Sequence, residues 1–275
     1  MTDKTTTLLF AQWQGSGSPR AWYLRKGAQQ LAELVAANPL SVDVGDADLE
    51  TQANIRGRAQ LLQQLRAAHT LLARTEPAHL LTLGGDCGVD LAPASYLNAR
   101  YDDLALVWLD AHADLNTPAS SPSGAFHGMI LRTLLGEGDA EFIAAAFSTF
   151  EPEQVFLAGA RDFDPPERAY AEGLEHLSAE TLERQPESLA ARIEKRGFGK
   201  LHIHLDLDVL EPTEFAATGY PTPQGLSVAG LVKLLNTLAE RFEVVGVTLT
   251  EFMPTGGNDM EKVQEVVQVV GSSLP

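Results

Sequence analysis

The sequence has little cysteine and no long apolar run. Its 275 residues include one cysteine, Cys87, so no disulfide can form within the chain. A single cysteine fits a reducing compartment, or a thiol that is kept for chemistry. No 18 apolar residues run together, and the apolar run near the N-terminus is too short for a signal peptide. We therefore expect a cytoplasmic protein without a membrane-spanning segment.

Positive charge is also scarce. The chain carries 20 Lys and Arg against 37 Asp and Glu, a formal net charge of -17. This charge repels nucleic-acid phosphates and anionic lipids, so we expect neither nucleic acid nor a membrane as a partner. Part of the charge is accounted for by a solvated acidic surface. Where carboxylates cluster in a fold they need cations, and a metal ion or a cationic substrate is the natural counter-charge.

Short apolar runs alternate with amphipathic segments of helical length. Strands are predicted at residues 7–13, 79–85, 104–110, 154–160, 201–210 and 243–252. Helices are predicted at 21–37, 53–75, 179–196 and 227–241, the last capped by Ser227. Nearly continuous apolar strands between helices indicate a mainly parallel sheet covered on both faces, a three-layer α/β/α fold. Since no linker, repeat or low-complexity segment appears, we predict one domain over residues 1–275.

Candidate metal ligands follow four of the predicted strands. They are Asp86 and Cys87, then Asp110, His112 and Asp114, then Asp206 and Asp208, and lastly Glu251. Parallel sheets bind ligands beyond the carboxyl ends of their strands, so these side chains should converge on one edge. Within the second and third groups the spacing of two predicts that an extended chain points the side chains the same way. Oxygen ligands with an imidazole suit Mn²⁺ or a similar ion, and this many acids favour two ions.

Two further histidines, His202 and His204, have the same strand parity as Asp206 and Asp208. They lie deeper in the predicted strand. We interpret them as core histidines, hydrogen-bonded to a neighbouring strand or to groups behind the ligands, rather than as ligands.

Ordered motifs over residues 80–255 resemble those of the arginases, within the ureohydrolase family that also contains the agmatinases. They are GGDCG (84–88), DAHADLNTP (110–118), SGAFHGM (123–129), GARDFDPPE (159–167), LDLDVLEP (205–212), ATGYPTPQGLS (217–227) and TEFMP (250–254). The first 75 residues match only in general pattern. The resemblance implies the ureohydrolase fold, hydrolysis of a guanidino compound at a centre of two Mn²⁺ ions, and a homotrimer or homohexamer.

The resemblance also implies a role for each ligand position. Asp110 and Asp206 would bridge the two ions, Cys87 and Asp114 would complete one, and His112 and Asp208 the other. Asp114 would orient the attacking water and accept its proton. His127 would carry that proton to the leaving amine, a role that its near-neutral pKa suits, and Glu251 would pair with the guanidinium.

Substrate contacts are implied in two of the motifs. Asn116, Ser121 and Ser123 match the arginase positions that grip a substrate's α-carboxylate, and Asp164 matches the one that holds the α-ammonium. Glu167, in the motif of Asp164, belongs to the predicted substrate contacts. These residues favour an amino acid such as arginine over agmatine, which has no carboxylate for such a grip.

Three positions depart from the arginase pattern: Cys87 replaces histidine, Ala125 replaces asparagine and Tyr220 replaces threonine. A thiolate is softer than imidazole and adds negative charge, which predicts lower arginase activity and room for Fe²⁺, Co²⁺ or Zn²⁺ beside Mn²⁺. The cysteine variant also resembles enzymes that convert Nω-hydroxy-L-arginine to hydroxyurea and ornithine. Other readings remain: an inert Cys87 thiol with a depleted metal site, an agmatinase or guanidino-acid hydrolase, a deacetylase-like enzyme with one Zn²⁺, and a catalytically weak binding protein.

Overall fold

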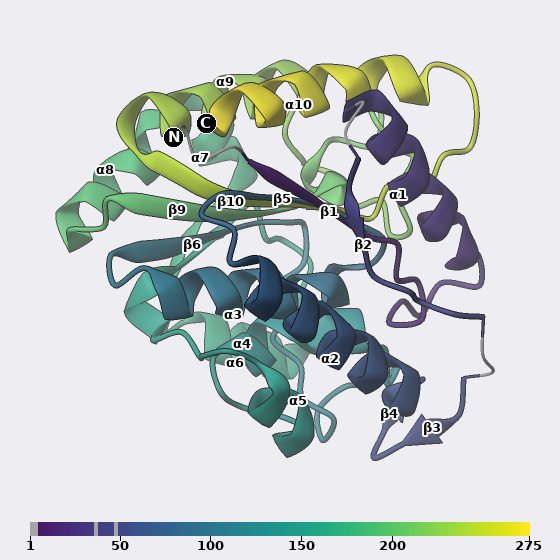
Figure 1. Ribbon diagram of the computed structural model, residues 1–275. Coiled ribbons are helices and arrows are strands. Elements are labelled where there is room, and N and C mark those ends of the chain that lie inside the picture. The colour runs from purple at the N-terminus through teal and green to yellow at the C-terminus, as the bar shows by residue number, and fades with distance from the viewer. Residues whose placement is uncertain (1–4, 36–37, 47–48) are drawn as a thin grey trace.

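The sheet at the centre of the protein has eight strands, and every neighbouring pair is parallel. A computed structural model describes residues 5–35, 38–46 and 49–275. The strand order is β2-β1-β5-β10-β9-β6-β7-β8 (Figure 1). The strands are β1 (Thr6–Phe10), β2 (Leu40–Ser41), β5 (Leu80–Gly84), β6 (Leu104–Leu109), β7 (Val155–Ala158), β8 (Glu175–Leu177), β9 (Lys200–Asp206) and β10 (Glu243–Thr250). The predicted parallel sheet is confirmed.

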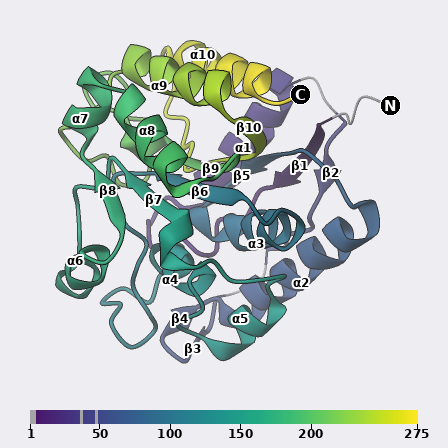
Figure 2. The ribbon, with the colours of Figure 1, turned by 90° about the vertical axis from the view of Figure 1, so that its left-hand side faces the viewer.

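Helices cover both faces of the sheet, as Figures 1 and 2 show. One face carries α1 (Trp22–Val35), α7 (Ala179–Arg184), α8 (Glu187–Arg196), α9 (Val228–Arg241) and α10 (Asp259–Ser273). The other carries α2 (Arg58–Thr75), α3 (Leu91–Arg100), α4 (Ile130–Leu134), α5 (Ala140–Ala145) and the end of α6 (Pro165–Ala171). Each face has its own buried apolar cluster, because both sides of the central strands are apolar. The three-layer α/β/α prediction is therefore confirmed.

Two predicted helices are wrong in their bounds. The helix expected at 53–75 begins at Arg58, because Gly57 has a φ of 69° and breaks the helix, and residues 51–56 form a hairpin of β3 (Thr51–Gln52) and β4 (Ile55–Arg56). The helix expected at 179–196 is two helices, since Pro186 supplies no N–H to continue the first.

Other boundaries agree more closely. The Ser227 hydroxyl caps α9, accepting a 2.9 Å hydrogen bond from the backbone N–H of Gly230. Residues 36 and 37, the end of the helix predicted at 21–37, lie outside the described residues. Short elements such as β2, β8 and α3–α6 lack a clear periodic signal and were not predicted. None of the helices in the described ranges is both long and apolar enough to cross a membrane.

The predicted strands also extend too far at their carboxyl ends. Those expected at 7–13, 201–210 and 243–252 end at Phe10, Asp206 and Thr250. The segments that follow β9 and β10 leave the sheet and contribute Asp208 and Glu251 to the wall of a cavity, so the ends of these strands position the site.

Candidate metal centre and substrate pocket

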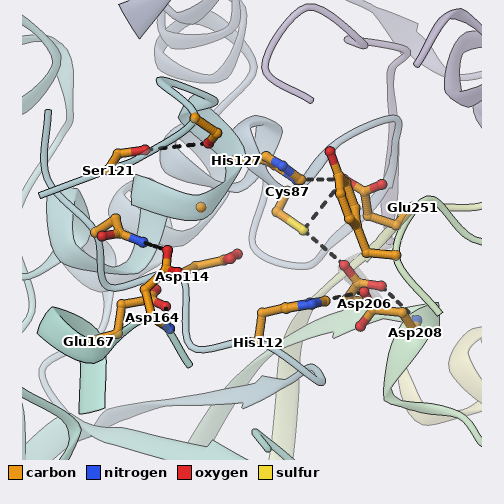
Figure 3. A pocket seen from close by; sticks show the side chains of 14 residues that line it. Cys87, His112, Asp114, Ser121, His127, Asp164, Glu167, Asp206, Asp208 and Glu251 are labelled. Atoms are coloured by element: carbon orange, nitrogen blue, oxygen red, sulfur yellow. Dashed lines mark hydrogen bonds and ion pairs between the residues drawn. The ribbon is translucent and has the colours of Figure 1, made fainter. Parts of the chain in front are cut away.

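The ends of β5, β6, β9 and β10 meet at a cavity of about 650 Å³, its mouth included (Figure 3). Its lining includes every predicted site residue except Asp86 and Asp110, which are both fully buried. The lining residues are Cys87, His112, Asp114, Asn116, Ser121, Ser123, His127, Gly128, Asp164, Glu167, Asp206, Asp208, Tyr220 and Glu251.

The turn after β5 is held by the carboxylate of Asp86. This group is buried and accepts hydrogen bonds from Gln12 Nε2 at 2.8 Å and from the backbone N–H groups of Gly15 and Gly88 at 2.8 and 2.9 Å. Burial, and then the negative charge of Glu251, raise the pKa of Asp86 to about 6. Asp86 therefore fixes the turn and does not reach the cavity.

Cys87 follows at the start of the 3-10 turn η1 (Cys87–Asp90), with its side chain buried. Its Sγ lies 3.1 Å from Asp206 Oδ2 and 3.9 Å from Glu251 Oε1. Burial, and then the carboxylate of Asp206, raise the pKa of the Cys87 thiol well above its ordinary value. A thiolate at this place therefore needs a cation beside it.

The segment after β6 was expected to be extended, and that expectation is wrong at its end. Asp114 has a φ of 52°, so the chain turns after His112. The three side chains still converge: His112 Nδ1 lies 3.4 Å from Asp110 Oδ1, and ligand atoms of Asp110 and Asp114 lie within 4.8 Å of each other. A left-handed turn, rather than strand parity, brings Asp114 to the cavity.

Asp206 and Asp208 converge through a turn as well. Asp206 is the last residue of β9, and Asp208 belongs to the 3-10 turn η4 (Leu207–Val209). Asp206 Oδ1 accepts a 2.7 Å hydrogen bond from the N–H of Asp208, whose Oδ2 lies 3.1 Å from His112 Nδ1. Burial would raise the pKa of Asp208, but His112 outweighs it and lowers that pKa. Burial and the charge of Asp208 raise the pKa of Asp206 well above its ordinary value.

The donor atoms fit metal ions. Asp110 Oδ2, Asp114 Oδ2 and Glu251 Oε2 are buried without a hydrogen-bond partner, which is costly for a carboxylate unless a cation faces it. Three groups of potential ligand atoms lie within 4.8 Å of one another: Cys87, Asp110, Asp114 and His204; Asp110, His112 and Asp208; and Cys87, His127 and Glu251. The first two share Asp110, so two cations could be held side by side. These two groups contain the ligands that the motifs predict except Asp206, and the first adds His204.

His127 and Glu251 form a pair on the other side of the cavity. His127 lies in the 3-10 turn η2 (Phe126–Met129), and its Nδ1 is 3.1 Å from Glu251 Oε1. Burial would lower the pKa of His127, but the hydrogen bond and charge of Glu251 outweigh it and raise that pKa. His127 therefore retains a proton more readily than a free histidine.

The residues predicted to grip an amino acid are already linked to one another. Asn116 Nδ2 donates to Asp164 Oδ2 at 2.8 Å, and Asn116 Oδ1 accepts from Ser120 Oγ at 2.9 Å. The hydroxyls of Ser121 and Ser123 lie 3.4 Å apart. All of these residues except Ser120 line the cavity, and Figure 3 shows Ser121 and Asp164 on the side away from Glu251.

Glu167 lies in the same wall but is engaged by the backbone. Its Oε1 accepts from the N–H of Leu115 and its Oε2 from the N–H of Asp164, both at 2.8 Å. The second bond is half of a capping box at the start of α6. Glu167 therefore fixes the positions of Asp114's loop and of Asp164, and its role as a substrate contact stays a prediction.

Sequence reasoning did not identify the support that the hairpin β3–β4 gives to this wall. Asn54 Nδ2 donates to the carbonyls of Pro118 and Ser121 at 2.7 and 3.1 Å, and the N–H of Arg56 donates to the carbonyl of Gly124 at 3.0 Å. The turn-forming sequence Ala53-Asn54 was the available signal. Tyr220 covers the mouth, its side chain 36% exposed and its ring centroid 5.3 Å from that of His127.

Asp90 was also missed. It accepts from His202 Nε2 at 2.8 Å, from His204 Nδ1 at 2.9 Å and from the Thr248 hydroxyl at 2.6 Å. Burial would raise the pKa of Asp90, but the two histidines lower it to about 2. Both histidines are fully buried and hydrogen-bonded, as predicted, through a carboxylate that the sequence pattern did not indicate.

Comparisons with known proteins place the chain in a family. The sequence model described as the Arginase family matches residues 21–273 and so includes most of the first 75 residues. The arginase of Staphylococcus aureus (strain COL) is 31% identical over 199 residues, which are 70% of this chain and 66% of that protein. The chain thus spans slightly less than two thirds of this relative's length.

Two solved structures share the fold. Entamoeba histolytica arginase in complex with L-ornithine gives a TM-score of 0.88 at 20% identity, covering 98% of this chain and 99% of that one. Arginase from Bacillus caldovelox gives 0.79 at 24% identity, covering 98% and 96%. With the family match over nearly the whole sequence, the chain belongs to the arginase family, as its motifs predict.

Proposed function

We propose that this protein hydrolyses the guanidino group of L-arginine or a close relative, giving ornithine and urea or a substituted urea, with the help of two divalent cations. One observation carries the proposal. A single cavity joins buried carboxylate oxygens that lack partners, a histidine–glutamate pair and a polar wall that suits an amino acid. Family membership supports the class of reaction.

The cations, with Mn²⁺ the first choice, would be held by the ligands at the strand ends. Cys87 and Asp114 would hold one and His112 and Asp208 the other, with Asp110 and Asp206 between them. When bound, the cations supply the positive charge that makes water a nucleophile at neutral pH.

The protein's own groups would position the substrate and move the proton. Glu251 has a free Oε2 in the cavity and would pair with the planar guanidinium, which suits a carboxylate geometrically. Asp114 Oδ2 would accept the proton of the attacking water. His127, held at Nδ1 by Glu251, would deliver a proton to the leaving amine.

The polar wall would hold the amino-acid end of the substrate. Asn116, Ser121 and Ser123 would donate to an α-carboxylate, and Asp164 would accept from an α-ammonium. Because Asn116 donates to Asp164, the two halves of the grip have a fixed spacing. This arrangement favours an amino acid over agmatine or a guanidino acid.

Nω-Hydroxy-L-arginine is the second candidate substrate, with hydroxyurea as the product. Cys87 favours it, because the sulfur lies 3.9 Å from the acid that would face the guanidinium. A thiolate at this position would be a soft, anionic metal ligand, and it would change the charge near the guanidino nitrogens of the substrate. Hydroxyarginine differs from arginine at one of these nitrogens, which carries a hydroxyl group.

The test is a reconstitution of the metal-free protein with Mn²⁺ and, separately, with Fe²⁺, Co²⁺ and Zn²⁺. Each form is assayed on arginine, hydroxyarginine, agmatine and guanidinobutyrate by chromatography of the released amine. We expect turnover of arginine or hydroxyarginine alone, and none by a D110N control. Preference for agmatine would contradict the proposed binding of an amino acid by the polar wall, and no turnover with any metal would favour a binding protein.

We also propose that the protein forms a homotrimer or homohexamer, which light scattering would test.

A further inference from the structure

The histidine His204 has one ring nitrogen that is not accounted for by its hydrogen bonds. The side chain is fully buried on β9, and its ring stacks on Trp108 with centroids 3.6 Å apart and planes 5° from parallel. Nδ1 lies 2.9 Å from Asp90 Oδ2, while Nε2 is buried without a partner. The stacking and the hydrogen bond fix the direction in which Nε2 points.

The partner of Nδ1 determines which nitrogen carries hydrogen. Asp90 is a carboxylate acceptor that also receives the Thr248 hydroxyl and His202 Nε2, so Nδ1 of His204 donates to it. Nε2 of the neutral ring then has a free lone pair. A carboxylate that orients an imidazole in this way is the usual arrangement behind a metal-bound histidine.

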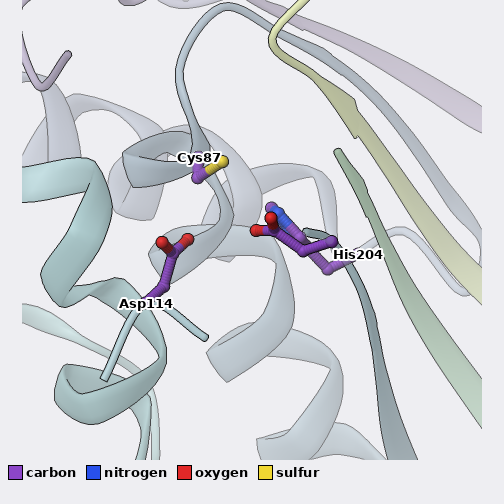
Figure 4. A group of neighbouring side chains, drawn as sticks. Cys87, Asp114 and His204 are labelled. Atoms are coloured by element: carbon purple, nitrogen blue, oxygen red, sulfur yellow. The ribbon is translucent and has the colours of Figure 1, made fainter. Parts of the chain in front are cut away.

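The side chains of Cys87, Asp114 and His204 lie around a common space in Figure 4. His204 and its three neighbours Cys87, Asp110 and Asp114 each offer one ligand atom, and these four atoms lie within 4.8 Å of one another. Metal–ligand bonds of about 2.0–2.3 Å are compatible with such separations. Asp110 Oδ2 and Asp114 Oδ2 are also buried without a hydrogen-bond partner. Because these atoms and His204 Nε2 are all acceptors, only a shared cation or an added proton can satisfy them.

We infer that Nε2 of His204 is a ligand of the metal ion that Cys87, Asp110 and Asp114 hold. This rests on the proposed metal-dependent function and adds a residue to its site. In the arginase pattern a histidine at position 87, in the turn after β5, would give this ion a nitrogen ligand. Here Cys87 replaces that histidine, and His204 on β9 would supply the nitrogen ligand instead. A neutral imidazole also adds no charge to a group of anions.

His202 is a matched control for His204. It lies on the same strand, is equally buried and bonds to the same carboxylate, through Nε2. Its free Nδ1, however, faces Gly246, where an added Cβ would lie 2.5 Å away, and it belongs to none of the groups of ligand atoms. H204N keeps an amide donor near the position of Nδ1 and removes Nε2, while H202Q keeps a donor near the position of Nε2.

The test is a titration of metal-free protein with Co²⁺, read by the thiolate-to-cobalt absorption band that reports binding beside Cys87. We expect the wild type and H202Q to develop this band with similar midpoints, and H204N to need at least about tenfold more Co²⁺. An unchanged midpoint in H204N would overturn the inference. So would the absence of the band in the wild type.

A second measurement does not depend on the folding of a variant. X-ray absorption of the wild type loaded with two equivalents of metal should show on average one imidazole per metal, from His112 and His204. One imidazole for every two metals would overturn the inference. A wild type that meets these expectations and hydrolyses no guanidino compound would refute the proposed function alone.

Discussion

Two acids of the site, Asp114 and Glu251, have an unusual backbone conformation, with φ of 52° and 61°. A left-handed conformation is unfavourable for a residue with a Cβ, and more so for glutamate than for aspartate. The N–H of Glu251 donates to the carbonyl of Gly85 at 2.7 Å, which helps to hold this conformation. The strain lies where both side chains turn into the cavity, which is consistent with a functional reason for it.

Glu251 provides the residue-scale prediction. E251Q keeps the shape of the side chain but removes the charge that would bind guanidinium and that holds His127. We expect kcat/KM for the best substrate to fall by about 100-fold or more, because acid–base and ion-pair contributions are lost together. Steady-state kinetics would measure this, with metal content by mass spectrometry as a parallel readout.

The control for this change lies on the same strand. Glu243 begins β10 at the far end from the cavity and contacts His79 and Lys200. E243Q should therefore leave kcat/KM unchanged. An E251Q protein with full metal content and nearly full activity would remove Glu251 from the proposed mechanism.

At the scale of elements, the wall formed by residues 117–124 depends on the hairpin β3–β4. Gly124 has a φ of 66°, and a Cβ there would lie 2.9 Å from the carbonyl oxygen of Asn54. Its own N–H donates to Ser121 Oγ at 3.1 Å. The contact between hairpin and wall thus requires glycine at this position.

G124A should displace this wall. We expect the free energy of unfolding to fall by about 1–2 kcal/mol, the cost of a left-handed alanine. KM should rise several-fold while kcat changes less, because Ser121 and Ser123 are predicted to bind the end of the substrate remote from the reaction. Chemical denaturation and steady-state kinetics would measure the two effects.

G271A is the matched control for this substitution. Gly271 lies in α10, and a Cβ at that position meets no atom within 4 Å. Alanine there should stabilise the helix slightly and leave KM unchanged. A G124A protein that loses kcat with KM unaltered would show that the wall acts on the chemistry and not on substrate binding.

At the scale of the whole molecule, the buried carboxyls couple stability to pH. Burial and then neighbouring carboxylates raise the pKa values of Asp110, Asp114 and Asp206 in the metal-free protein, and burial raises that of Asp86 to about 6. The folded state therefore binds more protons than the unfolded chain, whose carboxyls titrate near pH ~4. Stability from these protons is complete below that pH and is lost as the pH rises through the raised folded values.

Metal binding should reverse this dependence, because the ligands must be deprotonated. Between pH of about 5.5 and 8, we expect the Tm of the metal-free protein to fall by several degrees and that of the metal-loaded protein to rise. Scanning calorimetry at high salt, which screens the net charge of -17, would isolate the buried groups. Slopes of the same sign with and without saturating metal would contradict a metal centre among these carboxylates.

The central strands of the sheet were predictable because each is a short apolar run, which can be recognised from neighbouring residues alone. The cap at Ser227 was predictable for the same reason. The helix expected at 53–75 was wrong because its apolar pattern continues through a left-handed glycine, Gly57. The one expected at 179–196 was wrong because Pro186 interrupts it. In these two cases the sequence contained the relevant residue, but apolar periodicity masked its effect.

The sequence by itself determined the family, the parallel sheet and the set of acids and histidines at the strand ends, because the ends of parallel strands share one edge. Only the tertiary structure decided how those side chains are aimed. The left-handed turn at Asp114 and the bond between Asp90 and His204, 114 positions apart, depend on packing between distant segments. Periodicity tells which face of a strand a side chain occupies, and packing determines what lies opposite it.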